Sequence, residues 1–309
     1  MKISKTSLSF AAIMLAMTLC VISCKKKETA TPEDSDTSSA SDNNFAQKTS
    51  NDIMNVAGQA SDIAVGDSLN SYRLREEEDV CGSSCAVITR DSVNRKITIT
   101  FSGGTCLDGH VRSGSLTLDY SGSATGARYY RHPGFKCVVT STNYVVDGNQ
   151  VNIVNKTITN TTPAGFDPKT TNETWSISSN INIVKAAGGG TISFTSTKVK
   201  TLLNTSDSTV YRGSAVKIMW SKARIGITGS ESGTTASSES FSASITSQLV
   251  RDMTCSPNAA YPGHHPFIQG AIDFTPGSKA TRHLDYGSGT CDDQATVTIN
   301  GKSYTISIK

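Results

Sequence analysis

Short runs of alternating apolar and polar residues dominate the chain from residue 85 onward, and Gly, Asn and Asp separate these runs. In residues 96–101, Ile97, Ile99 and Phe101 fall on one face of an extended chain, with threonines on the other. No helical pattern separates the runs, which disfavours parallel α/β folds, because those need crossover helices. The pattern predicts an all-β protein: an antiparallel β-sandwich or a curled β-roll or barrel of about a dozen strands, with one short N-terminal helix.

Three predicted hairpins define the register of these strands. In the clearest one, Asn300-Gly301 suits a type I′ turn, which needs positive φ at both central positions. That turn places Val297 opposite Tyr304, so that the apolar residues of both strands share one face. The other two hairpins turn at Asp147-Gly148, which pairs Tyr144 with Val151, and at residues 188–190.

The region before the strands changes character near residue 51. Residues 25–50 are mostly Ser, Thr, Asp, Glu, Asn and Lys, and such a segment cannot bury enough surface to offset its ordering entropy. Residues 24–50 are therefore predicted to form a disordered tether with a root-mean-square reach of about 28 Å. A short amphipathic helix and a charged connector are predicted within residues 51–80, and the all-β domain within 81–309. The apolar positions of that helix are Ile53, Val56, Ala57, Ala60, Ile63 and Ala64.

Residues 1–23 have the features of a bacterial secretory signal. Two lysines precede a mostly apolar run, 8–22, which is too short to span a bilayer. The run ends in "VISC", which matches a lipobox: an aliphatic residue, a small residue directly before the cysteine, and then Cys24. Cys20 fits less well, because the preceding Leu19 is too bulky for the small-residue position. The sequence thus predicts cleavage before Cys24 and its acylation, palmitate included, and several acyl chains hold a protein stably on a bilayer.

The charge balance excludes one class of partner. The formal net charge is +3, and removal of the signal, with two lysines and no acidic residue, leaves +1. A nucleic-acid-binding domain would show a basic patch or stripe, so no nucleic-acid partner is expected. The basic run Lys25 to Lys27 follows the predicted lipid directly, where it faces anionic headgroups or solvent.

Six cysteines follow Cys24, an even number that is typical of disulfides in an exported protein. Two near-repeated segments, FSGGTCLDG (101–109) and YGSGTCDDQ (286–294), each end a strand at a glycine-rich corner and have another cysteine upstream. They favour two bonds and indicate that the β domain has two similar halves. A zinc site is disfavoured, because the Cys-x3-Cys pair near residue 81 has no second ligand pair. The predicted bonds are Cys85–Cys106 and Cys255–Cys291, which leaves Cys81–Cys137 as the third.

Two further features can each be interpreted either as a ligand site or as a purely structural turn or loop. The pairs Asp108-Gly109 and Asp292-Asp293 offer oxygen ligands to calcium, but they lack the density of a self-contained site and suit a turn. The segment YPGHHPF offers histidines for a metal or aromatics for a sugar, although adjacent side chains of an extended chain point in opposite directions. An exposed loop is favoured there. The candidate ligand residues of this loop are Tyr261, His264, His265 and Phe267.

The motifs of nucleophilic and zinc hydrolases do not occur: the sequence has neither G-x-S-x-G nor H-E-x-x-H. A carboxylate pair for glycoside hydrolysis leaves no such motif, because its members meet only in space. Trp175 and Trp220 suit either a sugar platform or, as the favoured interpretation, a core position. The sequence therefore assigns no catalytic, cofactor-binding or metal-binding residue.

Three segments resemble a recurrent group of uncharacterised Bacteroidota lipoproteins: TRHLDYGSGTCDDQATVTINGKSYTISI at the C-terminus, ITITFSGGTCLDGHVRSGSLTLDYSG near the first strands, and TSTNYVVDGNQV between them. The resemblance extends over most of residues 80–309. This chain has His110 where the group often has Arg, and Thr100 where it often has Asp, which weakens a functional role for the first block's acidic residue. The resemblance implies export, lipidation and an all-β body, but no activity.

Three tripeptides, DSL, DSV and DST, resemble the Asp-Ser/Thr motif of O-glycosylation in Bacteroidota. A modified serine must lie exposed. The candidate acceptors are Ser68, Ser92 and Ser208.

Together these features predict an outer-membrane lipoprotein of the cell envelope, on either membrane face, with a non-enzymatic binding or structural role. The expected partners are the membrane, through the lipid, and a glycan or another envelope protein. The alternatives are a carbohydrate-active hydrolase and a β-barrel carrier of an apolar ligand. Two facing carboxylates would favour the hydrolase, an open apolar cavity the carrier, and a flat aromatic patch the binding protein.

Overall fold

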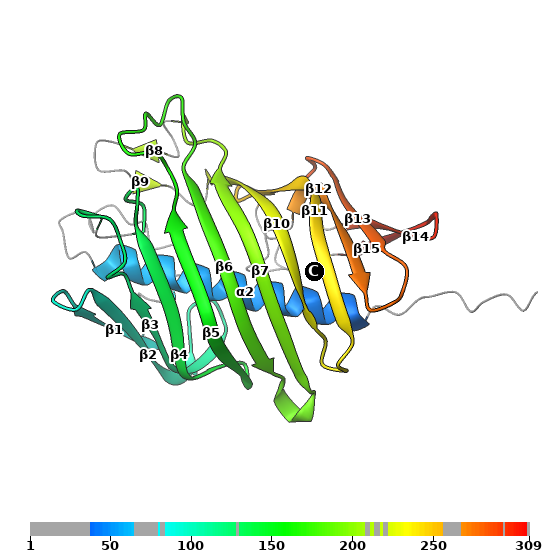
Figure 1. Cartoon of the computed structure of the whole chain (residues 1–309), viewed down its shortest axis with the longest axis horizontal. Helices are drawn as coiled ribbons and strands as arrows, with labels where there is room; N and C mark the ends of the chain where they lie inside the picture. The colour runs from blue at the N-terminus through cyan, green and yellow to red at the C-terminus, as the bar shows by residue number, and fades with distance from the viewer. Residues whose placement is uncertain are drawn as a thin grey trace, which may run out of the picture. The chain divides into compact units, whose positions relative to one another are not determined.

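Thirteen antiparallel strands form one open sheet in the computed structural model, which describes residues 38–64, 80, 84–127, 130–207, 211–212, 217–218, 222–255, 267–292 and 294–307. Each strand pairs with its neighbour in sequence, except that β10 pairs with β7, as the ribbon in Figure 1 shows. Between these two, β8 (Tyr211–Arg212) and β9 (Lys217–Ile218) form a separate two-stranded sheet. The strands of the main sheet are β1 (Ala86–Asp91), β2 (Lys96–Thr105), β3 (Val111–Asp119), β4 (Lys136–Val146), β5 (Asn149–Asn160), β6 (Thr174–Val184), β7 (Thr191–Leu202), β10 (Arg224–Thr234), β11 (Ser240–Asp252), β12 (Phe267–Pro276), β13 (Arg282–Ser288), β14 (Gln294–Ile299) and β15 (Lys302–Ser307).

Several predicted features lie outside the described residues. They are the signal peptide at 1–23, Cys24, Ser68, Cys81, Ser208, Trp220, Tyr261, His264, His265 and Asp293.

The predicted all-β class, antiparallel pairing and approximate strand number are confirmed. Ile97, Ile99 and Phe101 of β2 are buried on one face, and Thr100 is exposed on the other. Val297 of β14 pairs with Tyr304 of β15, as predicted. The architecture is a single open sheet with β1 and β15 at its edges, and a helix, not a second large sheet, covers one of its faces. The sheet runs through both predicted halves without a break.

The predicted type I′ turn at Asn300-Gly301 has the backbone conformation that its sequence requires, and the predicted hairpin turn at Asp147-Gly148 has the same conformation. Asn300 and Gly301 have φ values of 50° and 78°, and Asp147 and Gly148 have 49° and 78°. Positive φ strains most L-residues, which explains Asn or Asp followed by Gly at these turns. A short 3₁₀ helix, η3 (Ala186–Gly188), connects β6 to β7.

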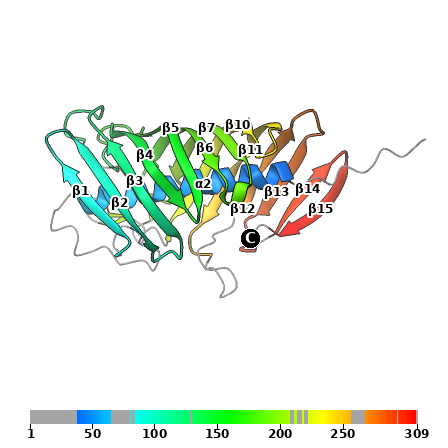
Figure 2. The same cartoon turned by 90° about the horizontal axis from the view of Figure 1, so that it is seen from below.

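The helix α2 (Ser38–Ala64) has 27 residues and corrects the predicted extent of the tether. Residues 51–64 are helical as predicted, but residues 38–50, expected within the disordered tether of 24–50, continue the same helix. α2 crosses the strands on one face of the sheet, which we call the inner face (Figures 1 and 2). No helix in the described part of the chain is both long enough and apolar enough to cross a membrane.

Burial of polar side chains explains why the helical structure of residues 38–50 was not predicted. An apolar pattern reveals a helix only where its buried side is apolar. In the N-terminal half of α2 the buried side consists of polar residues around one alanine: Ser39, Asp42, Asn43, Ala46, Gln47 and Ser50.

The main core lies between α2 and the inner face, and it contains Trp175. This side chain is fully buried, stacks on Tyr130 with ring centroids 5.2 Å apart, and donates a hydrogen bond of 3.2 Å to the Tyr130 carbonyl oxygen. Trp175 therefore has the favoured core position and cannot act as a sugar platform.

Two of the three predicted disulfides are confirmed. Cys85 bonds Cys106 and Cys255 bonds Cys291, with Cα–Cα distances of 5.2 and 5.5 Å. They close loops of 21 and 36 residues. Loops of this length are expected to stabilise the fold by roughly 3–4 kcal/mol each.

The third predicted bond, Cys81–Cys137, is corrected, because Cys137 is a buried free thiol. Its side chain points into the core from β4, where its cross-strand neighbour is Ile158. Burial raises the pKa of the Cys137 thiol, so the group stays neutral and behaves as a small apolar side chain.

Candidate functional site

A groove lined by hydroxyl groups lies on the strands β7, β10, β11 and β12, and we call it the hydroxyl groove. Its volume is about 530 Å³, within the range of ligand sites. Nine of its twelve lining residues are Ser or Thr. The lining consists of Thr195, Ser196, Thr197, Ser230, Glu231, Ser232, Ser242, Ala243, Ser244, Asp273, Thr275 and Thr281.

Strand register assembles the groove from residues far apart in sequence. Two rows of paired residues cross the sheet on its outer face, opposite α2, and neighbours within such a row lie about 5 Å apart. Small side chains in both rows leave the hollow. One row is Thr195, Ser232, Ser242 and Thr275; the other is Thr197, Ser230, Ser244, Asp273 and His283.

A histidine–aspartate pair ends the second row. The Nδ1 atom of His283 lies 2.6 Å from Oδ1 of Asp273, and both side chains are almost half exposed. Asp273 therefore brings a carboxylate to the groove at a position that solvent reaches.

The second acidic residue of the lining, Glu231, is bound from the inner face. Its Oε2 atom lies 2.7 Å from Nζ of Lys198, and its Oε1 atom accepts a hydrogen bond of 2.8 Å from Asn43 of α2. Glu231 is only 6% exposed. The groove thus has one accessible carboxylate, where glycoside hydrolysis in most families uses two.

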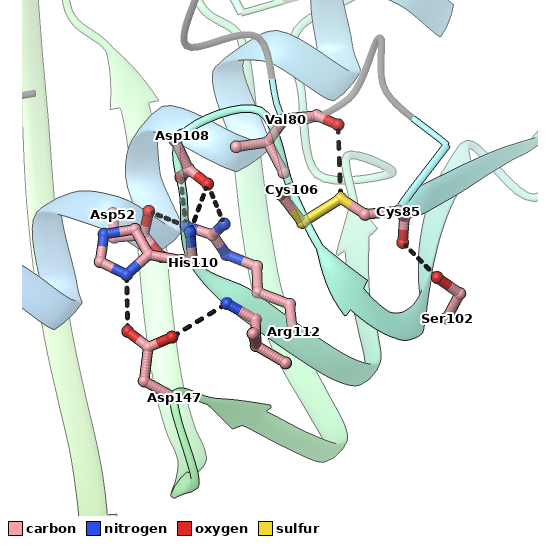
Figure 3. The surroundings of a disulfide bond; sticks show 10 residues. Asp52, Val80, Cys85, Ser102, Cys106, Asp108, His110, Arg112 and Asp147 are labelled. Carbon is pink, nitrogen blue, oxygen red and sulfur yellow. Dashed lines mark hydrogen bonds and ion pairs between the residues drawn. A yellow bond between two sulfur atoms is a disulfide. The ribbon is translucent and has the colours of Figure 1, made fainter.

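A second polar cluster surrounds Arg112 of β3, beside the disulfide Cys85–Cys106 (Figure 3). The guanidinium of Arg112 is fully buried and donates two hydrogen bonds of 2.7 Å to Asp108 and one of 2.6 Å to Asp52 of α2. Burial alone would lower the pKa of Arg112, but the hydrogen bonds to Asp108 and the charge of Asp52 raise it. Burial also raises the pKa of Asp52, and Arg112 opposes that shift.

The exposed rim of this cluster repeats the histidine–aspartate pairing seen at the groove. His110 lies between β2 and β3, and its Nδ1 atom is 2.6 Å from Oδ2 of Asp147 (Figure 3). Because the carboxylates of Asp52 and Asp108 are already bound to Arg112, the cluster joins α2 to the sheet and offers no second substrate site. Within the described residues, no group of three His, Cys, Asp or Glu side chains could hold a metal ion.

The structure places the remaining predicted residues as follows. Asp108 binds Arg112 and the backbone N–H of His110, and Asp292 accepts a hydrogen bond from the backbone N–H of Gln294, so both stabilise turns as the favoured interpretation holds. Ser92 is exposed in the β1–β2 turn, as an O-glycosylation acceptor must be.

The prediction for Phe267 as a loop residue is wrong. Phe267 begins β12, is partly buried, and packs edge-on against Tyr286 with ring centroids 5.4 Å apart.

The sequence did not predict the groove residues as a site, because alternating Ser and Thr residues are already expected on the solvent-exposed face of a sheet. Only the strand register shows which serines lie side by side. The one sequence signal for the groove was the high density of Ser and Thr in residues 191–197, 228–247 and 275–281.

Comparisons with protein-family models, curated proteins and solved structures found no match.

Proposed function

We propose that this protein is an exported, lipid-anchored protein of the cell envelope that binds a glycan, without catalysis, through the hydroxyl groove. The observation that carries the proposal is the groove itself: eight hydroxyl-bearing residues and one accessible carboxylate, Asp273, on an exposed sheet face, Ser196 being buried on the inner face. The membrane is the second partner, through acylated Cys24.

Two independent features support export and anchoring. The signal sequence and the "VISC" lipobox point to acylation at Cys24. Two disulfides fit an oxidising compartment outside the cytoplasm. The resemblance to Bacteroidota lipoproteins agrees with both and favours the outer membrane.

The chemistry of the groove suits a polyhydroxylated chain. A hydroxyl group donates and accepts, so it can exchange its water for either role of a sugar hydroxyl. Each such hydrogen bond contributes only about 0.5–1.5 kcal/mol net, and no aromatic side chain lines the groove. We therefore expect weak binding per site and a preference for long polymers, which several lipid-anchored copies engage together.

The two alternative functions receive less support from the geometry. A hydrolase needs a second carboxylate facing Asp273, and Glu231 is bound by Lys198 on the other face. A carrier needs an open apolar cavity, and α2 packs over the apolar inner face of the sheet.

The lipid anchor is tested first. In cells fed a palmitate analogue, we expect the wild-type protein to be labelled and to sediment with membranes. Cys24→Ala should be unlabelled and should leave the outer-membrane fraction, whereas Cys20→Ala, the control, should behave as wild type. Labelling of Cys24→Ala would contradict the assignment.

Glycan binding by the groove is tested with a substitution that fills the groove with a bulky side chain. Ser244→Trp places a large side chain in the middle of the second row and should reduce retention on an array of neutral and acidic polysaccharides at least tenfold. Asp273→Asn should reduce it less. Thr100→Trp on the exposed face of β2 is the matched control and should bind as wild type. Absence of wild-type binding to every polysaccharide, or equal binding by Ser244→Trp, would overturn the glycan proposal without affecting the lipid anchor.

A further inference from the structure

The two halves of α2 are held on the sheet by different kinds of contact. Among the fully buried residues of 38–50 only Ala46 is apolar, and the partly buried Ala40 and Phe45 add apolar contacts with the core. The buried side of residues 51–60 is apolar and belongs to the main core: Ile53, Met54, Val56, Ala57 and Ala60.

The N-terminal half is fixed by hydrogen bonds and ion pairs to turns and strands of the sheet. Asp42 lies 2.9 Å from Nζ of Lys185 and accepts a hydrogen bond of 2.8 Å from the backbone N–H of Ala236. Asn43 and Gln47 both donate to Glu231, at 2.8 and 3.3 Å. Water can replace such contacts, so each contributes little net free energy to docking. Ser39 adds a hydrogen bond to Glu239 in the turn before β11.

Release of the C-terminal half of α2 would break more stabilising contacts than release of the N-terminal half. Its undocking would expose apolar core surface, break the contact between Asp52 and Arg112, and remove the hydroxyl of Ser61 from the backbone N–H of Tyr130, 3.0 Å away. The larger apolar burial therefore holds this half more firmly.

A buried lysine lies under the junction of the two halves. Nζ of Lys156 in β5 donates to Ser50 of α2 at 2.9 Å and to Ser179 of β6 at 2.8 Å, and the residue is 1% exposed. The charged group that acts on it from β7 is Lys198, which Glu231 of β10 already pairs. The opposite neighbour on β4 is the apolar Val139.

Lys156 thus has hydroxyl partners and no carboxylate partner in the described part of the chain. Burial, and secondarily the charge of Lys198, lower its pKa to about 7. Docking of Ser50 over this amine is therefore more favourable when the amine is neutral than when it is charged.

We propose that residues 38–50 form a releasable latch, which undocks from the inner face while residues 51–64 remain packed. If Cys24 carries the lipid, as the proposed function holds, release would add the 13 residues 38–50 to the chain between the lipid and the packed part of α2. The sheet could then lie farther from the membrane.

The docked state of the latch, residues 38–50, should become more stable as the pH rises. Once Ser50 leaves, Lys156 is solvated and its pKa returns toward 10.5, so that release takes up a proton. Release is therefore favoured as the pH falls from 10 to 7. Below 7 the amine is charged in both states and the dependence on this group ends.

Hydrogen exchange of the mature lipoprotein in detergent tests the latch. After correction for intrinsic rates, amides of residues 42–50 should exchange faster than those of 54–61, and their opening should increase up to about 50-fold from pH 9 to pH 7, the limit for one proton taken up between these pKa values. Lys156→Met should slow exchange in 42–50 and reduce the pH dependence to the part supplied by Lys48 of α2, whose pKa burial also lowers. Lys96→Met, on the exposed side of β2, is the matched control and should leave both unchanged.

Three results would overturn the latch. The first is equal exchange of the two segments at both pH values, which means that α2 opens as one unit. The others are slower exchange in 42–50 than in 54–61, and a pH dependence as large in Lys156→Met as in wild type. If Lys156→Met does not fold, Ser50→Ala decides. Loss of one hydroxyl partner should speed exchange in 42–50 alone, and no change there contradicts the proposal. The unlipidated Cys24→Ala protein should give the same exchange pattern, so that failure of the lipid assignment and failure of the latch are separate outcomes.

Discussion

Replacement of Arg112 by alanine is expected to destabilise the folded protein by about 3–5 kcal/mol at pH 8, because it removes one partner of a buried ion pair. The guanidinium is fully buried and bonds two carboxylates, Asp108 and Asp52. Without it, two partly buried negative charges face each other with no positive charge between them. The helix α2 and the β2–β3 turn lose their common attachment at the same time.

The loss should depend on pH in a defined direction. In Arg112→Ala, burial and repulsion by Asp108 raise the folded-state pKa of Asp52 above its unfolded value. Ionisation of Asp52 then opposes folding, so the variant should recover stability as the pH falls from 8 to 5. Asp52 shows the same tendency in the native protein, where burial already raises its pKa despite Arg112.

Urea unfolding followed by tryptophan fluorescence measures the effect. Lys96→Ala is the control, because its ion pair with Asp119 is exposed and 3.6 Å long, and it should change the free energy of unfolding by less than about 1 kcal/mol. If Arg112→Ala does not fold, addition of Asp52→Asn and Asp108→Asn should restore folding. A loss below about 1 kcal/mol would contradict the role assigned to Arg112.

The sequence was sufficient for those parts of the fold that rest on local chemistry. Strand alternation and type I′ turns are local, and they gave the sheet class and the register of the β14–β15 hairpin. The pairing of Cys106 with Cys85 and of Cys291 with Cys255 followed from two similar glycine-rich corners, where strand ends bring an upstream cysteine into reach. The predicted Cys81–Cys137 bond was wrong because the inward-facing position of Cys137 in β4 depends on the whole core and not on cysteine spacing.

The features that escaped prediction depend on partners remote in sequence. Asn43 lies 188 residues from Glu231, and Ser50 lies 106 from Lys156, so no local pattern marks residues 38–50 as a helix. Ser244 and Asp273 became candidate ligand residues only through the pairing of β11 with β12. Buried polar contacts of this kind are invisible to hydrophobic periodicity, which explains why a tether was predicted where a docked helix lies.

Replacement of Lys156 by methionine is expected to raise the free energy of unfolding by about 2–4 kcal/mol at pH 7. A pKa lowered from 10.5 to about 7 corresponds to at most about 5 kcal/mol of penalty on the charged amine. Methionine retains most of the volume and removes the charge, at the loss of two hydrogen bonds. Ser50 and Ser179 keep a partner, because their hydroxyls are 3.1 Å apart and bond each other.

The pH dependence distinguishes relief of this penalty from better packing. The folded-state pKa of Lys156 is depressed, so wild-type stability rises between pH 7 and 10.5 and is independent of this group below 7. The gain in Lys156→Met should therefore be largest at pH 7 and below, and should disappear near pH 10. Burial also lowers the pKa of Lys200, to about 8, but both proteins share that contribution and their difference removes it.

Urea unfolding of wild type and Lys156→Met at pH 6, 7, 8, 9 and 10, with the disulfides intact, gives this difference directly. Lys96→Met controls for the loss of one positive charge and should show no trend. A gain that stays constant from pH 6 to 10 would mean that methionine only packs better. A loss of stability at pH 7 would show that the two serine contacts outweigh the burial of the amine.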